Sequence, residues 1–189
     1  MTTPIPTPIP TPGQTVGPFY GFALPYRRDH ELVTPAHPGA IRLHGTVFDG
    51  AGAPVPDALL EIRQAGPDGV VPTVDGSIRR DGTRFTGWGR AGVDPGGHYA
   101  FTTLVPGPAA PGRAPFIAVV VFARGLMDRL FTRAYVPGPW LDGDPFLAAL
   151  DRDERATLVA GVEPTGDLRF DVRLQGPGQT TFLTFEGTS

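Results

Sequence analysis

Turn-forming residues constrain this chain more than any other feature. It contains 26 glycines and 23 prolines among its 189 residues. Inside a helix, proline costs about 3 kcal/mol and glycine about 1 kcal/mol relative to alanine. Long helices are therefore disfavoured, and short strands joined by many turns are favoured. Because 40% of the residues are hydrophobic, we interpret the chain as loop-rich and folded, not as disordered.

Apolar and polar residues alternate with a period of two, which predicts strands. The predicted strands span residues 41–47, 59–64, 99–105, 116–123, 130–136, 168–174 and 180–185. The run 116–123 is almost wholly apolar, which predicts a strand buried on both faces. Seven short strands separated by turns predict an all-β fold in which two antiparallel sheets form a β-sandwich.

The remaining segments complete the predicted organisation. Asp144 suits a helix N-cap and Pro145 the first helical position, so one short helix is expected before Gly161. Residues 66–97 have few apolar side chains and are expected to form long loops. Residues 1–12, where proline alternates with other residues, are expected to form an extended arm. Residues 13–189 are expected to form a single domain, because roughly 100 to 200 residues is the usual domain size.

Composition disfavours several classes of partner. The net charge of −3 and the pI of about 5.7 argue against nucleic acid. All 16 basic residues are arginine, which suits bidentate pairing with carboxylates. The absence of cysteine removes disulfides and cysteine nucleophiles. The sequence shows neither a signal-peptide pattern nor a long apolar stretch, so we expect a cytoplasmic protein with no membrane partner.

No residue pattern by itself specifies a catalytic or metal site. Gly87-Trp88-Gly89 leads into no predicted helix, so it is not interpreted as a phosphate loop. Neither Ser77 nor Ser189 lies in a nucleophile elbow. The acidic residues between 142 and 154 are interpreted as solvated charge around a helix start. The histidines are isolated in sequence and are each interpreted as structural or exposed: His30, His37, His44 and His98.

Two features favour binding, each with a simpler alternative. The segment Gln14-Thr15-Val16-Gly17-Pro18-Phe19-Tyr20 combines a backbone hinge, a proline and two aromatic residues. It suits a rigid wall against a flat ligand, or equally a simple turn packed on its own domain. Arg133 lies between Phe131 and Tyr135 on one predicted strand face, where it could bind a carboxylate through two hydrogen bonds or serve only as a solubilising group.

Several longer motifs carry a resemblance to a known family. They read TPGQTVGPFY, IRLHGTVFDGAGAPVPDALLEIRQA, GWGRAGVDPGGHYAF, APFIAVVVFARGLMDRLFTRAYV and RFDVRLQGPGQTTF, and together they cover nearly the whole chain. The sequence resembles the α chains of the protocatechuate 3,4-dioxygenase family. The enzymes of this family cleave aromatic rings in the intradiol manner and are built from α and β chains. The resemblance implies a mixed β-sandwich that pairs with a homologous β chain in a hetero-oligomer of αβ pairs.

The same resemblance implies a non-haem ferric ion held by two tyrosines and two histidines of the β chain. Where the β chain has His-x-His, this chain has Phe116-Ile117-Ala118. Ala109 replaces one ligand tyrosine, and no tyrosine lies near Ser77, where the other is expected. We therefore expect no metal ligand in this chain. The run 122–125 and Arg133 also resemble the α chain, although Arg63 stands where the family usually has tryptophan.

The resemblance also implies roles. Thr15, Gly17 and Pro18 are expected to line the substrate pocket beside the partner's iron, and Arg133 to hold the carboxylate of 3,4-dihydroxybenzoate, which O₂ cleaves to 3-carboxy-cis,cis-muconate. Arg113 matches an arginine that precedes the β chain's histidine pair and is interpreted as a remnant. Two alternatives remain: a non-catalytic β-sandwich interaction module, or a subunit of an intradiol dioxygenase that acts on a different catechol.

Overall fold

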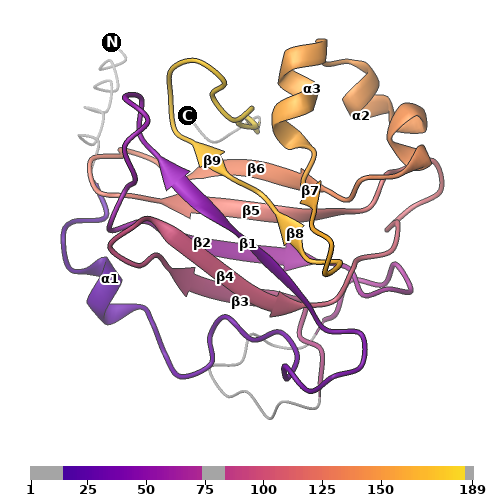
Figure 1. The fold of residues 1–189 in the computed structure, drawn as a ribbon, viewed down its shortest axis with the longest axis horizontal. Helices are drawn as coiled ribbons and strands as arrows, with labels where there is room; N and C mark the ends of the chain where they lie inside the picture. The colour runs from indigo at the N-terminus through magenta and orange to yellow at the C-terminus, as the bar shows by residue number, and fades with distance from the viewer. Residues whose placement is uncertain (1–14, 74–83, 186–189) are drawn as a thin grey trace, which may run out of the picture.

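Two β-sheets pack face to face in the computed structural model, which describes residues 15–73 and 84–185 (Figure 1). One sheet has the order β4-β1-β8-β7, with β9 also paired to β1, and the other has the order β3-β2-β5-β6. The strands are β1 (Ile41–Phe48), β2 (Leu59–Gln64), β3 (Trp88–Gly92), β4 (His98–Thr103), β5 (Phe116–Phe122), β6 (Leu130–Tyr135), β7 (Gly161–Val162), β8 (Leu168–Arg169) and β9 (Val172–Arg173). The β-sandwich is confirmed, and it is mixed, as the family resemblance implied. The expectation of two antiparallel sheets is wrong for the first sheet, because β1 runs parallel to β8 and β9.

Short helices lie outside the two sheets. They are α1 (Tyr20–Ala23), a 3₁₀ helix (Pro139–Gly143), α2 (Pro145–Ala148) and α3 (Arg152–Leu158). The prediction of a single helix after Asp144 is wrong in detail, because α2 ends at Ala148 and Asp151 caps a separate helix, α3. Asp144 does cap α2, as expected, by accepting hydrogen bonds from the amides of Phe146 and Leu147. None of the helices in the described part of the chain has the length and hydrophobicity needed to span a membrane.

The main core lies between the sheets, where β1, β2, β4 and β5 contribute alternate residues. Its members include fully buried Leu43, Ile62, Phe101, Ile117 and Val119. A second, smaller cluster covers the outer face of the four-stranded sheet near the end of β6, where Tyr135 packs with residues of α2 and α3. The outer face of this sheet is thus partly covered by helices and partly open.

The prediction that 116–123 is buried on both faces is wrong. Burial alternates along β5, with Ile117, Val119 and Val121 inside and the residues between them half exposed. The apolar residues of the outer face therefore do not all belong to the core. This difference matters for the site, since the half-exposed face of β5 carries Phe116 and Ala118.

The predicted strand 168–174 is split into β8 and β9, for a local reason. At the break, the Phe170 carbonyl oxygen accepts a hydrogen bond from the Tyr99 hydroxyl. The Asp171 carboxylate accepts from the Thr46 amide at 2.9 Å. Side chains here serve the Thr46 amide and the Phe170 carbonyl in place of a main-chain bond, although the Phe170 amide still donates to the His44 carbonyl oxygen at 2.8 Å. Gly45 allows β1 to come close to Phe170. Alternation alone does not show such a substitution.

Other predicted boundaries also differ. Residues 180–185 form no regular strand, although the Leu183 amide donates to the Phe131 carbonyl oxygen at 2.7 Å. The segment 66–97, predicted as loops, contains β3, and β7 was not predicted. The predicted arm 1–12 lies outside the described residues, and the single domain 13–189 stays a prediction.

Substituting Gly45 tests the close approach of β1 to the β8–β9 break. A Cβ atom at Gly45 would overlap the Phe170 carbonyl oxygen. We expect Gly45→Ala to lower the free energy of unfolding by more than about 2 kcal/mol, because backbone on both sides must move. Urea denaturation of the purified protein measures the change.

Gly92→Ala is the matched control. Gly92 also lies in a strand, but a Cβ there would meet nothing within 4 Å. We expect a change within about 1 kcal/mol for this substitution. Equal stabilities of the two variants would show that β1 does not approach Phe170 this closely.

Candidate functional site

The segment expected to act as a wall, residues 15–18, is presented at the surface just before α1. Thr15 and Pro18 are exposed, and Gly17 adopts a left-handed conformation with φ of 74°. The Gly17 amide donates to the Thr15 hydroxyl at 3.3 Å, which closes a tight turn. We call residues 15–18 the wall segment. Its conformation leaves the side chains of Thr15 and Pro18 available to another molecule.

Tyr20 anchors the wall segment to the sandwich. It is buried, whereas its neighbour Phe19 is 74% exposed. Burial raises the pKa of the Tyr20 hydroxyl, and the nearby Asp57 carboxylate raises it further. The phenol therefore stays neutral at physiological pH and serves as an apolar anchor.

Beyond α1, an ion pair on the outer face of the four-stranded sheet holds the chain. Arg90 of β3 donates to one Glu61 carboxylate oxygen of β2 from two nitrogens, at 2.9 and 2.6 Å. A third nitrogen of Arg90 donates to the Leu24 carbonyl oxygen at 2.8 Å. Tyr26 stacks on Trp88, with ring centroids 6.4 Å apart. Sequence reasoning missed this connection because β3 itself was not predicted.

Arg133 occupies the outer face of β6 in an aromatic setting. Its guanidinium carbon lies 4.4 Å from the Phe116 ring centroid and 4.8 Å from that of Phe146. One nitrogen donates to the Tyr135 hydroxyl at 3.0 Å. The pKa of Tyr135 is raised by burial, a shift that the nearby Arg133 partly offsets. Since a guanidinium has five N–H donors, this arrangement orients Arg133 and leaves donors for a carboxylate.

One chain does not bring the wall segment and Arg133 into a single pocket. Tyr20 lies near Asp57 and Arg124, where β2 begins and β5 has ended. Arg133 pairs with Ala118, which lies four residues along β5 from Phe122. The part of the sheet near Tyr20 and the part that carries Arg133 are therefore separated by roughly 13 Å along the strand direction. Figure 1 likewise shows α1 at the lower left of the view and α2 and α3 at the upper right.

The residues that the family resemblance matches to metal-ligand positions do come together. Ala109, Phe116 and Ala118 line one pocket of about 190 Å³, together with Arg63, Gln64, Ala65, Val71 and Gly107. Gln64 is buried, and its side-chain amide is satisfied by Leu104 and Thr103. Among the described residues that line the pocket there is no carboxylate, imidazole or phenolate, so these residues do not fit a ferric ion. The expected position of the second tyrosine, near Ser77, lies outside the described residues.

Arg113 lies in a different depression. It lines a wider hollow of about 700 Å³ with Trp140 and Pro139, which also touches Ala109. The arginine side chain is exposed at the surface. Its interpretation as a remnant stays a prediction.

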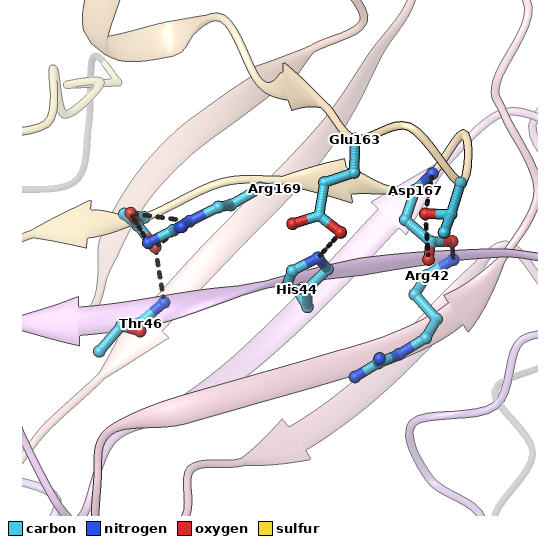
Figure 2. Close-up of polar contacts among 8 residues, drawn as sticks. Arg42, His44, Thr46, Glu163, Asp167 and Arg169 are labelled. Carbon is cyan, nitrogen blue, oxygen red and sulfur yellow. Dashed lines mark hydrogen bonds and ion pairs between the residues drawn. The ribbon is translucent and has the colours of Figure 1, made fainter.

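Each histidine has a local partner and stands apart from the others. His44 of β1 lies on the exposed face of the five-stranded sheet, 3.2 Å from a Glu163 carboxylate oxygen (Figure 2). Next to it, Asp167 accepts a hydrogen bond from the Arg42 amide at 2.7 Å, and this bond lowers the pKa of the Asp167 carboxyl. Within residues 15–73 and 84–185, no three acidic, histidine or cysteine side chains gather as a metal site. We interpret the polar residues of Figure 2 as fastening β1 to β8.

Comparisons with known proteins agree with this architecture. The α chain of protocatechuate 3,4-dioxygenase from Burkholderia cepacia is 38% identical over 187 residues, which cover 89% of this chain and 94% of that protein. The α chain from Pseudomonas putida is 32% identical, with 90% and 94% covered. The β chain from Burkholderia cepacia is 31% identical over 72% of this chain and 64% of its own length. No family model matches the sequence.

A solved structure shows the same fold. The dioxygenase domain of a dioxygenase–carbohydrate-binding protein fusion from Streptomyces sp. SirexAA-E aligns with a TM-score of 0.59 and 31% identity, over 89% of this chain and all of that one. The fold and these relatives together define a β-sandwich subunit of an intradiol ring-cleaving dioxygenase. The chain belongs to the family of protocatechuate 3,4-dioxygenase α chains.

Family membership has two further consequences. It implies non-haem iron in the assembled enzyme, and the relatedness to both α and β chains implies an αβ hetero-oligomer. A non-catalytic interaction module is not favoured. Thr15, Gly17, Pro18 and Arg133 as substrate-binding residues stay predictions.

Removal of the Arg90 guanidinium should loosen the chain around α1. Arg90→Gln loses the contact with Leu24, and because a hydrogen bond is worth about 1 kcal/mol, amides of residues 20–26 should exchange with deuterium roughly fivefold faster. Hydrogen–deuterium exchange with mass spectrometry measures this. Arg155→Gln, which removes an exposed pair with Asp142, should leave these peptides unchanged. Equal exchange in all three proteins would show that Arg90 does not hold the segment.

Proposed function

We propose that this chain is the non-iron subunit of a protocatechuate 3,4-dioxygenase. In the assembled enzyme, O₂ cleaves 3,4-dihydroxybenzoate between its hydroxyl-bearing carbons to give 3-carboxy-cis,cis-muconate. The observation that carries the proposal is the set of side chains that meet where the family places ligands. Ala109, Phe116 and Ala118 cannot hold iron, while relatives named as α chains span nearly the whole sequence. A cytoplasmic location is part of the same proposal.

In this proposal a ferric ion would be held by the homologous β chain, where it would supply activation of the bound catechol. The contribution of this chain is to bind, orient and exclude water. The wall segment suits this task, because Thr15 and Pro18 are exposed and the turn at Gly17 is closed by its own hydrogen bond. Tyr20 and Arg90 hold the segment against the sandwich.

Arg133 binds the carboxylate of the substrate in the same proposal. Two aromatic rings and Tyr135 orient its guanidinium, so little rotational freedom is lost on binding. The wall segment and Arg133 lie in separate parts of the surface of one chain.

Co-expression with a β-like chain tests the division of labour. We expect a stable complex with one iron per αβ pair and a ferric-tyrosinate absorption band, and no iron in this chain purified alone. Metal analysis and visible spectra of both preparations provide the measurement. Stoichiometric iron with turnover in the isolated chain would overturn the proposal.

Truncation of Arg133 tests the substrate assignment. Loss of one partner from a buried charge pair costs about 2 to 5 kcal/mol, so Arg133→Ala in the complex should raise KM for 3,4-dihydroxybenzoate at least tenfold. KM for catechol, which lacks the carboxylate, should hardly change. Steady-state kinetics on both substrates, with Arg155→Ala as the control, measure the effect.

Equal losses on both substrates would remove the assignment of Arg133. Faster turnover of a hydroxylated or chlorinated catechol than of 3,4-dihydroxybenzoate would instead support the alternative that the complex acts on a different catechol.

A further inference from the structure

The outer face of the four-stranded sheet carries an unusual row of side chains. Arg63 of β2 pairs with Ala118 of β5, and Ala118 pairs with Arg133 of β6. Neighbouring strands lie about 4.8 Å apart, so the two arginine backbones are roughly 10 Å apart with only a methyl group between them. Two positive side chains therefore flank a gap.

No carboxylate within residues 15–73 and 84–185 forms an ion pair with this row. Among the described residues, neither Arg63 nor Arg133 forms an ion pair, whereas Arg28, Arg90, Arg124, Arg155 and Arg169 each do. Arg63 donates one hydrogen bond, to the Pro72 carbonyl oxygen at 3.2 Å. Most donors of the Arg63 guanidinium therefore stay available at the surface, and the second charge on Arg133 strengthens the attraction for an anion.

The gap opens into the pocket that Arg63 helps to line. Its other lining groups are mainly apolar, since Ala65, Val71, Ala109, Phe116 and Ala118 face it. The volume is about 190 Å³, and an apolar cavity of roughly 150 Å³ already holds a benzene ring. The pocket thus has room for one six-membered ring.

We propose that this pocket binds a small aromatic carboxylate, with the ring against Phe116 and Ala118 and the carboxylate on Arg63. Arg63 forms a charge-assisted pair with the ligand, and burial of the ring in the apolar pocket supplies the remaining affinity. The described lining residues all come from this chain. Arg63 and Ala118 have no part in the proposed function.

Binding of 4-fluorobenzoate to the assembled enzyme, followed by fluorine NMR, tests this proposal. The sample is kept free of O₂ and saturated with catechol, so that the iron site is filled by a ligand without a carboxylate. We expect saturable binding of one 4-fluorobenzoate per copy of this chain. No saturable binding would overturn the proposal.

Two variants locate the bound ligand. Arg63→Gln, at an exposed position, should weaken binding at least tenfold, and Ala118→Leu, which fills the gap, should abolish it. Arg124→Gln is the matched control, because Arg124 is an exposed arginine paired with Asp57 beyond the far end of β5, and it should bind as the unmodified enzyme does. Unchanged affinity in Arg63→Gln would overturn the proposal even if Ala118→Leu fails to fold.

Competition and turnover complete the test. Hexanoate should displace 4-fluorobenzoate at least tenfold less well than benzoate, and equal displacement would refute an aromatic ligand. Turnover of 3,4-dihydroxybenzoate should be unchanged in Arg63→Gln, so a failure of this pocket is distinguishable from a failure of the proposed function, which the Arg133 kinetics report.

Discussion

The pairing of β5 with both β2 and β6 is the constraint on which the rest of the structure depends. It places Ile117, Val119 and Val121 in the core between the sheets and turns Phe116 and Ala118 outward. Because side chains alternate along a strand, the same seven residues build the core and a surface pocket. Phe116 and Ala118, which the family resemblance matches to metal-ligand positions, therefore lie on the outward face, where they do not disturb the interior.

The N-terminal segment depends on the same sheet through a different interaction. The Glu61–Arg90 pair crosses from β2 to β3 and extends to the Leu24 carbonyl oxygen. Tyr20, the first residue of α1, is a buried aromatic anchor on the N-terminal side of Leu24. Contacts at both ends of α1 thus hold a segment in which Thr15, Pro18 and Phe19 are exposed. Such a fixed geometry suits a surface that another chain must contact.

Much of the sandwich could be predicted from alternation, because each long strand has one buried face. The strands from Leu59, Phe116 and Leu130 begin at the predicted residues. The break between β8 and β9 could not be predicted, since it depends on Tyr99 and Asp171 replacing main-chain hydrogen bonds across distant parts of the sequence. The short strand β3 was missed because it has only five residues, two of them glycine.

For the candidate site, the sequence by itself determined which chemistry is absent. At the positions that the family resemblance matches to metal ligands, the side chains of Ala109, Phe116 and Ala118 carry no metal-binding atoms. It also singled out Arg133 and the residues around Gly17. Only the tertiary structure decided that Ala109 joins Phe116 and Ala118 around one pocket, that Arg63 and Arg133 flank Ala118, and that the wall segment lies away from Arg133. The physical reason is that strand register and sheet order, which involve residues far apart in sequence, set these distances, and local alternation contains no information about either.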